Sequence, residues 1–534
     1  PCRTSKPFRG MISLQRHVIP RTSVTGFGST LESWSQEEKA IFLTGDLTLE
    51  NLKAQCLKKK AHTKPWQREL LHQCLTKAYA TIQEHAEVRK NIELLLHENT
   101  MTITTGHQLS LGLGPLFLLY KALHVINLCA AFNKSAQPFT FVPVFWLASE
   151  DHDFEEVKHT HFFNKTFSWD STQTGPVGRF NTENLQEVYN AVKSLFPEDR
   201  SLNALFEVQE VRYGQHFRAL LNKVFGKFGL VVLNGDEPEL KRAFSPFMKR
   251  EVETRFVSKA VEETNTLLLS HGKTIQAHVR PVNLFYLTPS RRDRIVPVET
   301  EFTIGNQTIT EPELIQTLEE HPERFSPNVL LRPLYQEFIL PNVCYVGGTG
   351  ELAYWTQLKG LFEEAIVPFP LLQTRVSAFI DKSGLDEASL PSYFRPLNEQ
   401  IDALIGKESE REEVFQGVEN QLDGLIRAMN HGVSAMGNDA KKWCGAQVNA
   451  IQTSIEQYKQ RWQKEQKQHQ ETKIKRLERL HQSFYPQGIP QERYTHLLHF
   501  CGTHSLDEWI EALKNGLDPF CSDIHIFVQN HEAE

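Results

Sequence analysis

The sequence has few cysteines, and they do not stand in the pairs that metal or redox motifs require. Its 534 residues include eight cysteines without any CxxC spacing: Cys2, Cys56, Cys74, Cys129, Cys344, Cys444, Cys501 and Cys521. Zinc ribbons and disulfide scaffolds depend on closely spaced or framework cysteines, so neither class is indicated. Scattered thiols are typical of a reducing compartment, and we expect the cytoplasm.

Long apolar runs and an excess of one charge are also missing. We expect no apolar stretch of the roughly 20 residues that a membrane-spanning helix needs, and no apolar region of a signal peptide near the N-terminus. Residues 1–10 precede Met11 without apolar periodicity, so we expect a disordered or non-native lead and leave them out of the fold prediction. The net charge of −7 gives no global reason to expect nucleic acid or a membrane as a partner.

Several common catalytic motifs are absent. The sequence contains no Walker loop, no GxGxxG dinucleotide fingerprint and no GxSxG nucleophile elbow. Hydrolases with an activated nucleophile are therefore disfavoured. The length exceeds what one hydrophobic core usually serves, so we expect two to four structural units or one fold with insertions.

The most informative stretch that is present runs from Phe141 to His161. An apolar segment, FVPVFWLAS, ends directly in EDHDFEEVKHTH. A continuous apolar run bounded by polar residues is typical of a strand in a parallel sheet that is covered on both faces, and such sheets bind ligands at the carboxyl ends of their strands. We therefore predict a site that includes Glu150, Asp151, His152 and Asp153.

Three other segments predict further strands of this sheet: 100–105 (TMTITT), 229–234 (GLVVLN) and 342–346 (NVCYV). A glycine-rich turn follows the first of them, and Pro115 then opens a helix, which with the strand at 139–147 makes a βαβ unit. We predict an α/β fold with a Rossmann-like parallel-sheet core, inserted subdomains and a C-terminal helical hairpin.

The C-terminal part has the spacing of a coiled coil. Two runs of apolar residues keep steps of three and four or their multiples, one from Val418 to Met436 and one from Val448 to Trp462. Gly437 and Asn438 between them predict the turn of an antiparallel hairpin. The predicted organisation is a helical layer at 11–99, the core at 100–164, 226–254 and 331–385, insertions at 165–225 and 255–330, the hairpin at 386–484 and a C-terminal segment at 485–534.

Two glycine turns are candidate anion-binding sites, because glycines let the backbone approach a ligand and a helix N-terminus presents unpaired N–H groups. The alternative is that these glycines only permit tight packing. Arginines suit carboxylate or phosphate, and three of them are included here. The candidates are Thr105, Gly106, His107, Gln108, Gly112 and Gly114 in the first turn, Gly347, Gly348, Gly350 and Glu351 in the second with Tyr354 and Gln357 on the helix face of Glu351, and Arg280, Arg332 and Arg375.

The acidic cluster has two alternative interpretations. Acidic residues after a strand commonly cap the next helix and face water. Asp151, His152, Asp153, His159 and His161 are also donors that suit a metal ion. In an extended segment, however, Asp151 and Asp153 face one side and His152 the other, so we predict no metal ligand here.

Four ordered motifs resemble the BshC family, the cysteine ligases of bacillithiol biosynthesis. They are TTGHQLSLGLGPLFLLYK (Thr104–Lys121), PVFWLASEDHDFEEV (Pro143–Val157), RPLYQEFILPNVCYVGGTGELAYWTQL (Arg332–Leu358) and the tail through YPQGIPQER (Tyr485–Arg493). The resemblance covers nearly the whole chain. It implies a core similar to class I nucleotidyltransferases, a coiled coil that pairs two subunits as a homodimer, and the joining of cysteine to the amine of glucosaminyl malate.

Two departures accompany the resemblance. Thr349 stands where the family usually has proline, and the His-x-Gly-His and Lys-Met-Ser-Lys-Ser motifs of class I synthetases are absent. The use of ATP is therefore an expectation from fold kinship.

A carboxylate and an amine do not condense in water without activation, because the ionised carboxylate is a poor electrophile. We expect His107 and the 106–114 turn to hold phosphate or developing acyl-phosphate charge, and the 150–153 cluster to bind an ammonium or hydroxyls and to supply the general base. The 347–351 turn would complete the pocket. This hypothesis requires His107, Asp151 and Gly348 to share one cleft.

Two other classes remain open at this point. A metal-dependent hydrolase would use the EDHDFEEVKHTH cluster. A non-catalytic interaction protein would be organised by the coiled-coil hairpin.

Overall fold

The computed structural model describes residues 12–82, 85–135, 137–163, 165–196, 202, 205–385, 390–409, 412–502 and 504–529. The chain forms two compact units. The larger unit contains residues 27–382 and 491–534 together with the segment before residue 23, and the smaller unit contains residues 23–26 and 383–490. The lead at 1–10 lies outside the described residues.

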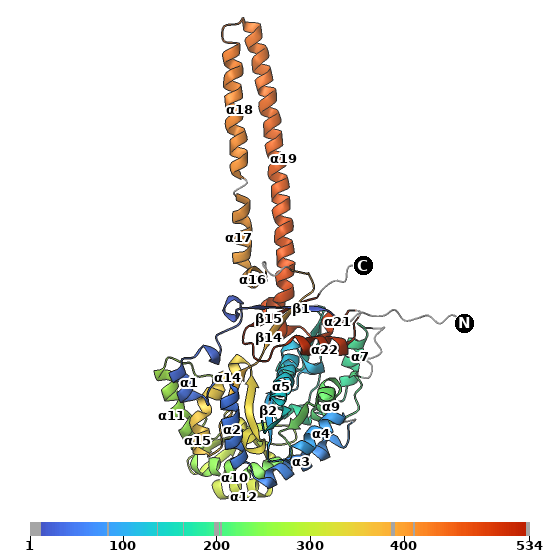
Figure 1. Ribbon diagram of the computed structural model, residues 1–534, viewed down its shortest axis with the longest axis vertical. Helices are drawn as coiled ribbons and strands as arrows, with labels where there is room; N and C mark the ends of the chain where they lie inside the picture. The colour runs from blue at the N-terminus through green and yellow to red at the C-terminus, as the bar shows by residue number, and fades with distance from the viewer. Residues whose placement is uncertain are drawn as a thin grey trace, which may run out of the picture. The chain divides into compact units, whose positions relative to one another are not determined.

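A five-stranded parallel sheet is the centre of the larger unit (Figure 1). Its strand order is β13-β12-β2-β3-β6, and every neighbouring pair is parallel. The first strand in the sequence, β2, lies in the middle, and the chain builds the sheet outward on both sides of it. This is the Rossmann arrangement, with its topological switch point between β2 and β12. The bounds are β2 Thr100–His107, β3 Thr140–Leu147, β6 Val231–Asn234, β12 Asn342–Gly347 and β13 Leu371–Thr374.

The central strands are apolar because both faces of the sheet are covered. On β3, Phe141 and Phe145 belong to one buried cluster, whereas Val142 and Val144 belong to the other. Alternate side chains therefore enter two separate cores, and the strand reads as a continuous apolar run. The four predicted strands and the parallel Rossmann-like core are confirmed. The fifth strand, β13, was not predicted.

Helix α5 (Leu116–Lys134) connects β2 to β3 and packs on both strands. Among the described residues it is the one helix that is long and apolar enough to cross a membrane, so the expectation that no stretch approaches that length was wrong. In the structure, 72% of its most apolar window is buried inside the protein. Helix α5 is therefore a core helix of the sheet.

Further helices and small sheets surround the central sheet. An antiparallel sheet of order β10-β9-β8-β7-β11 forms within the second predicted insertion, and β4 pairs with β5. The strands are β4 His159–Phe162, β5 Lys165–Ser168, β7 Leu284–Leu287, β8 Arg292–Val298, β9 Glu301–Ile304, β10 Gln307–Thr310 and β11 Phe325–Pro327. The helices are α1 Gln36–Phe42, α2 Leu49–His62, α3 Pro65–Tyr79, α4 Ala86–Leu94, α6 Phe154–Val157, α7 Leu185–Lys193, α9 Tyr213–Phe225, α10 Pro238–Thr254, α11 Phe256–Ser270, α12 Glu311–Glu320, α13 Arg332–Ile339, α14 Thr349–Trp355 and α15 Lys359–Glu364.

The two ends of the described chain meet in a third sheet. Strand β1 (Leu14–Ile19) pairs antiparallel with β15 (Ile524–Gln529), which pairs parallel with β14 (Ser377–Asp381). Short helices precede β15: α20 Gln491–Tyr494, α21 Leu498–Cys501 and α22 Leu506–Gly516.

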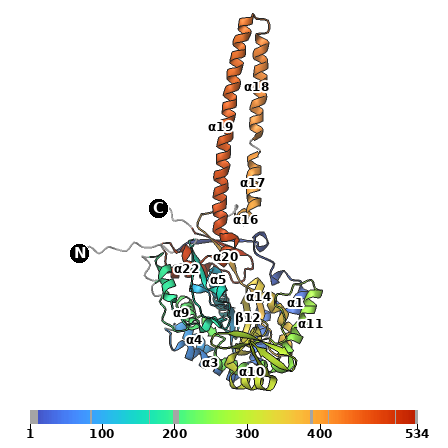
Figure 2. The ribbon, with the colours of Figure 1, turned by 180° about the vertical axis from the view of Figure 1, so that it is seen from behind.

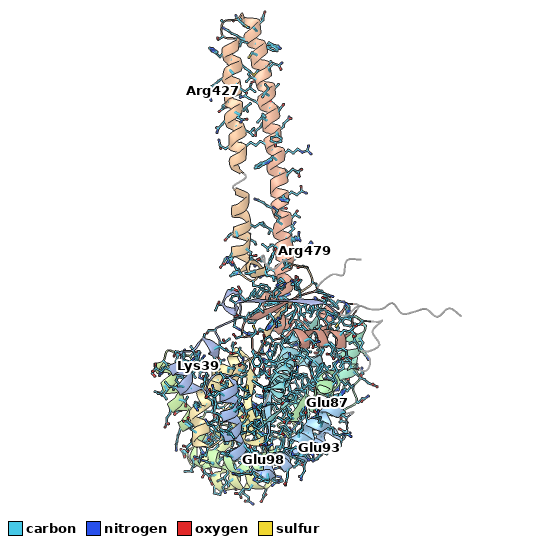
Figure 3. All side chains as sticks on the ribbon, viewed as in Figure 1. Lys39, Glu87, Glu93, Glu98, Arg427 and Arg479 are labelled. Atoms are coloured by element: carbon cyan, nitrogen blue, oxygen red, sulfur yellow. The ribbon has the colours of Figure 1, made fainter. Side chains whose placement is uncertain are left out.

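The smaller unit is a helical hairpin. Its helices are α16 Leu390–Tyr393, α17 Leu397–Ser409, α18 Glu412–Gly432 and α19 Asn438–Phe484, and α18 and α19 run side by side in both views (Figures 1 and 2). Gly437 is the N-cap of α19, so the predicted turn is confirmed. Val448 is buried in the seam, whereas Leu425 and Tyr458 are 50% and 55% exposed. The labelled Arg427 and Arg479 lie on the outer surface of this unit (Figure 3).

Candidate active site

The larger unit contains a cavity of about 900 Å³ at the carboxyl ends of β2, β3 and β12. Its walls also include side chains of α5 and α14, of β7 and β8, and of the segment that follows the hairpin in sequence. His107, Asp151 and Gly348 all line this cavity. The two glycine turns and the acidic cluster therefore meet in one cleft, at the switch point where open α/β sheets bind their ligands.

His107 is the last residue of β2, and its ring packs against Phe117 of α5 with 4.8 Å between the ring centroids. Burial and, to a smaller extent, the neighbouring Lys121 lower the pKa of His107 to about 3. The imidazole is therefore neutral near pH 7. Its buried Nδ1 has no hydrogen-bond partner among the residues that the structure describes.

Lys121 is a site residue that sequence reasoning missed. Its Nζ lies 2.5 Å from Glu351 Oε2 and donates to the carbonyl of Gly106 at 2.8 Å. Burial lowers the pKa of Lys121, while Glu351 opposes that shift. The same Glu351 carboxylate accepts the N–H of Gly348 at 2.8 Å and thereby caps α14. The available signal was a single lysine in an otherwise apolar helical turn, LFLLYK.

Two predicted arginines stand near this lysine. Arg332 opens α13, and its Nη1 donates to Gln336 Oε1 at 2.9 Å. The buried Arg375 forms an ion pair with Glu492 of α20 and donates to Ser377 Oγ at 3.1 Å. Lys121, Arg332 and Arg375 all line the cavity. Three cations at the β2–β12 switch point suit an anionic ligand such as a phosphate group.

Carboxylates form the opposite end of the cavity, beyond β3. Asp151 Oδ2 accepts a hydrogen bond from Gln108 Nε2 at 2.6 Å, and its Oδ1 accepts the N–H of His152 at 2.8 Å and lies 3.7 Å from Arg292 Nη1. Burial opposes ionisation of Asp151, but the hydrogen bonds from His152 and Gln108 outweigh it and hold its pKa below the ordinary range. Asp151 is therefore a permanent negative charge at neutral pH. Glu150 and Glu156 line the same end.

The cavity brings together most of the predicted site residues and leaves the others outside it. Seven predicted residues do not line the cavity: Thr105, Gly112, Gly114, His152, Asp153, Gly347 and Gln357. Twelve do: Gly106, His107, Gln108, Glu150, Asp151, Arg280, Arg332, Gly348, Gly350, Glu351, Tyr354 and Arg375.

The first correction concerns the glycine turn before α5. The N–H of Leu116, the first residue of α5, donates to the carbonyl of Thr495 at 3.0 Å, and the carbonyl of Gly112 accepts from the His496 ring at 2.8 Å. The chain itself therefore covers this helix start, and Gly112 and Gly114 have φ angles of 65° and 61°, which favour glycine at both positions. Thr105 Oγ1 donates to the Val346 carbonyl across the sheet.

The second correction concerns helix faces. Helix α14 ends at Trp355, so Gln357 does not continue the face of Glu351; it bonds the N–H groups of Gln276 and Ala277 at 3.0 and 2.8 Å. Asp153 is the N-cap of α6 and accepts the N–H of Glu156. This is the helix-capping role that was one interpretation of the acidic residues after the strand.

The metal alternative finds no support. Among the described residues, no group of three His, Cys, Asp or Glu side chains is placed to hold an ion. His159 Nδ1 lies 2.7 Å from Ser168 Oγ, and the His161 ring stacks on Tyr494.

A Rossmann-like sheet with a charged cavity at its switch point defines an α/β enzyme that acts on small polar molecules. Residues 30–376 match the family model described as bacillithiol biosynthesis BshC, N-terminal Rossmann-like domain, and residues 369–528 match its C-terminal coiled-coil domain. The chain belongs to the BshC family.

Relatives of this family extend along most of the chain. A protein of Flavobacterium johnsoniae is 35% identical over 468 residues, which cover 85% of this chain and 88% of the relative. A protein of Christiangramia forsetii is 34% identical over 506 residues, covering 91% and 93%. One of Bacillus cytotoxicus is 25% identical over 449 residues, covering 78% and 83%. All three are assigned as cysteine ligases, BshC.

Proposed function

We propose that the protein is a cysteine ligase of bacillithiol biosynthesis that joins the carboxyl group of L-cysteine to the amine of glucosaminyl malate. The observation that carries this proposal is a single cavity that is lined both by cations beside β12 and by an ionised aspartate after β3. Lys121 and Arg375, which pair with Glu351 and Glu492, stand with Arg332 at one end, and Asp151, 3.7 Å from Arg292, stands at the other. Amide formation brings together an activated, anionic acyl group and an amine that arrives as an ammonium ion, and each end suits one of these partners.

The cationic end fits a nucleotide co-substrate. ATP, when bound, supplies the activation that the cysteine carboxylate needs. Lys121, Arg332 and Arg375 would face its phosphates, and the backbone at Gly348 and Gly350 lines the same cavity. The neutral His107 can donate a hydrogen bond to the oxygen on which negative charge develops, because its ring is buried and one ring nitrogen has no partner among the described residues.

The carboxylate end of the cavity fits the acceptor amine. Asp151 remains ionised, and Gln108 fixes the orientation of its carboxylate. An ionised carboxylate attracts the substrate ammonium and places its nitrogen near the acyl group that the other end holds.

We assign the hairpin the role of pairing two subunits as a homodimer. Apolar side chains of its predicted seams remain about half exposed within one copy, including Leu425, Met436 and Tyr458. A second hairpin would cover them and exclude water from them. We place the reaction in the cytoplasm, since no disulfide joins the described cysteines.

A mass-balance assay tests the proposal. The purified protein receives L-cysteine, glucosaminyl malate and ATP, and the thiol product is followed together with AMP and ADP. We expect product only when all three compounds are present, with one nucleotide product released for each amide. If the folded protein forms no thiol product, the proposed ligase activity is refuted. If product forms without nucleotide turnover, only the proposed role of ATP is refuted. Light scattering of the eluting protein measures the subunit number.

A further inference from the structure

A row of four alternating charges ends at the carboxylate end of the cavity. Arg179 donates from Nε and Nη2 to Asp236 at 2.6 and 2.7 Å. Lys241 Nζ lies 2.7 Å from Asp236 Oδ1 and 2.6 Å from Glu150 Oε1. We call these four residues the charge row. Glu150 is its member that lines the cavity.

The members of the charge row come from four different parts of the fold. Arg179 ends a short 3-10 helix of the first predicted insertion, and Asp236 follows β6. Lys241 lies in the first turns of α10, and Glu150 follows β3. Lys241 is 1% exposed, so it acts on the cavity only through Glu150.

The two carboxylates of the row are not equally compensated. Asp236 accepts two hydrogen bonds from Arg179 and also contacts Lys241. Among the described residues, the one cation in contact with Glu150 is Lys241, which Glu150 shares with Asp236. Burial raises the pKa of Glu150, Lys241 opposes that shift, and the charge of Asp236 reinforces it. A carboxylate whose pKa moves toward neutrality can take up and return a proton at working pH.

Adjacent carboxylates thus stand in contrasting surroundings. Asp151 is held ionised by hydrogen bonds from Gln108 and His152, whereas Glu150 is buried beside a shared ammonium. Two carboxyl groups with pKa values driven apart can divide binding and proton transfer between them.

We propose that Glu150 accepts the proton of the attacking amine, that Asp151 binds the ammonium, and that Lys241 is a positioning residue for Glu150. This inference rests on the proposed function and assigns separate roles within its site. The ammonium gives one proton to Glu150, and the freed nitrogen lone pair forms the C–N bond with the activated acyl carbon. The bond from that carbon to its phosphate-type leaving group breaks, with the electron pair remaining on the phosphate oxygen. The second nitrogen proton passes to water as the amide forms.

Other charged or titratable groups face Glu150 and contribute to its titration. Arg292 of β8 favours the ionised form. Burial raises the pKa of Tyr335 of α13, with Glu150 and Asp236 adding to the shift, so this phenol stays neutral, and it donates to the Gly235 carbonyl at 2.9 Å. Lys241 is the cation in direct contact with Glu150, and its removal therefore has the largest expected effect.

The test is the pH dependence of kcat in the complete ligase reaction. Glu150→Gln should lower kcat by about 10²-fold to 10⁴-fold and remove the acid limb of the profile. Lys241→Met removes the contacting cation, so the acid limb should move to higher pH by about one unit or more. At pH values below that limb, kcat should then be about tenfold lower than in the wild type. Lys241→Arg keeps the charge and should keep the wild-type profile.

Asp236→Asn should shift the acid limb of the pH profile in the opposite direction. It removes the competing carboxylate and leaves Lys241 to Glu150, so the acid limb should move to lower pH. Arg218→Met is a matched control, because Arg218 is a buried cation that forms an ion pair with Glu237 at 2.8 Å beside the start of α10 and does not line the cavity. This control should lose thermal stability and retain the wild-type profile.

Wild-type kcat in Glu150→Gln would overturn the inference, as would acid limbs of Lys241→Met and Asp236→Asn that do not move in opposite directions. If Lys241→Met fails to fold, the shift of Asp236→Asn decides alone. A wild-type protein that forms no amide refutes the proposed function, and the inference falls with it, whereas an active wild type with unshifted variants refutes the inference only.

Discussion

Gly178 approaches the loop that carries the carboxylate end so closely that one added methyl group should impair catalysis. Its N–H donates to the Ser149 carbonyl at 2.8 Å, and the N–H of Val177 donates to the Asp151 carbonyl at 2.8 Å. A Cβ atom added at Gly178 would lie 2.4 Å from Ser149 Cβ and 2.8 Å from Ser149 O. Neither of these atoms is the end of a flexible side chain, so the loop itself must move.

The size of the effect follows from these distances. Carbon atoms in contact stand about 3.5–4.0 Å apart, so the 149–151 loop must retreat by roughly 1 Å. Such overpacking typically costs about 1–3 kcal/mol of stability. Glu150 and Asp151 move with the loop, and a misplacement of about 1 Å can cost on the order of 10²-fold in rate. We therefore expect Gly178→Ala to fold, with a lower melting temperature and about 1% of wild-type kcat.

The assay compares kcat and the melting temperature of Gly178→Ala with those of Gly28→Ala. Gly28 is the matched control, because a Cβ atom there would meet nothing within 4 Å and neither glycine has a positive φ. Gly28→Ala should match the wild type in both measurements. If Gly178→Ala retained wild-type kcat, the position of the 149–151 loop would not limit the reaction, and the assignment of the carboxylate end would fail.

Two further predictions concern buried charges. Burial lowers the pKa of His124 and His216 to about 3 and that of His496 to about 4. Because these pKa values lie below the unfolded value of roughly 6.5, the folded state loses stability as the pH falls below about 6.5. The loss should be about 2 kcal/mol for each histidine at pH 5. A melting temperature that stays constant from pH 7 to pH 5 would contradict this. Lys121→Met leaves the Glu351 carboxylate without its cation and should lower both the melting temperature and ATP affinity. The double variant with Glu351→Gln should recover the melting temperature but not the affinity in a calorimetric titration, and recovery of affinity would remove Lys121 from the phosphate end.

Much of the core could be predicted because buried parallel strands leave a direct trace in the sequence. The strand at 140–147 is a continuous apolar run, since both of its faces are covered. The carboxyl ends of parallel strands share one edge, which is why His107, Asp151 and Gly348 were expected to meet and do meet.

The rest depends on contacts that no local pattern contains. Lys121 lies on a helix that looks like pure core, and only the packing of α5 beside β2 and β12 brings it to Glu351. Arg375 owes its position to Glu492, which is 117 residues away in sequence. Gln357 was misplaced because helical spacing was extended past Trp355, where α14 ends. The roles of these residues in catalysis remain predictions.

The pairing of β1 with β15 has a consequence for how the protein is made. Arg21, just after β1, bonds Asp523, just before β15, across 502 positions of sequence. A ribosome must therefore synthesise the chain as far as β15 before this sheet can close, and until then β1 lacks the strand with which it pairs. Nascent chains should consequently expose an unpaired edge for most of their synthesis, which is a natural point for a chaperone to bind.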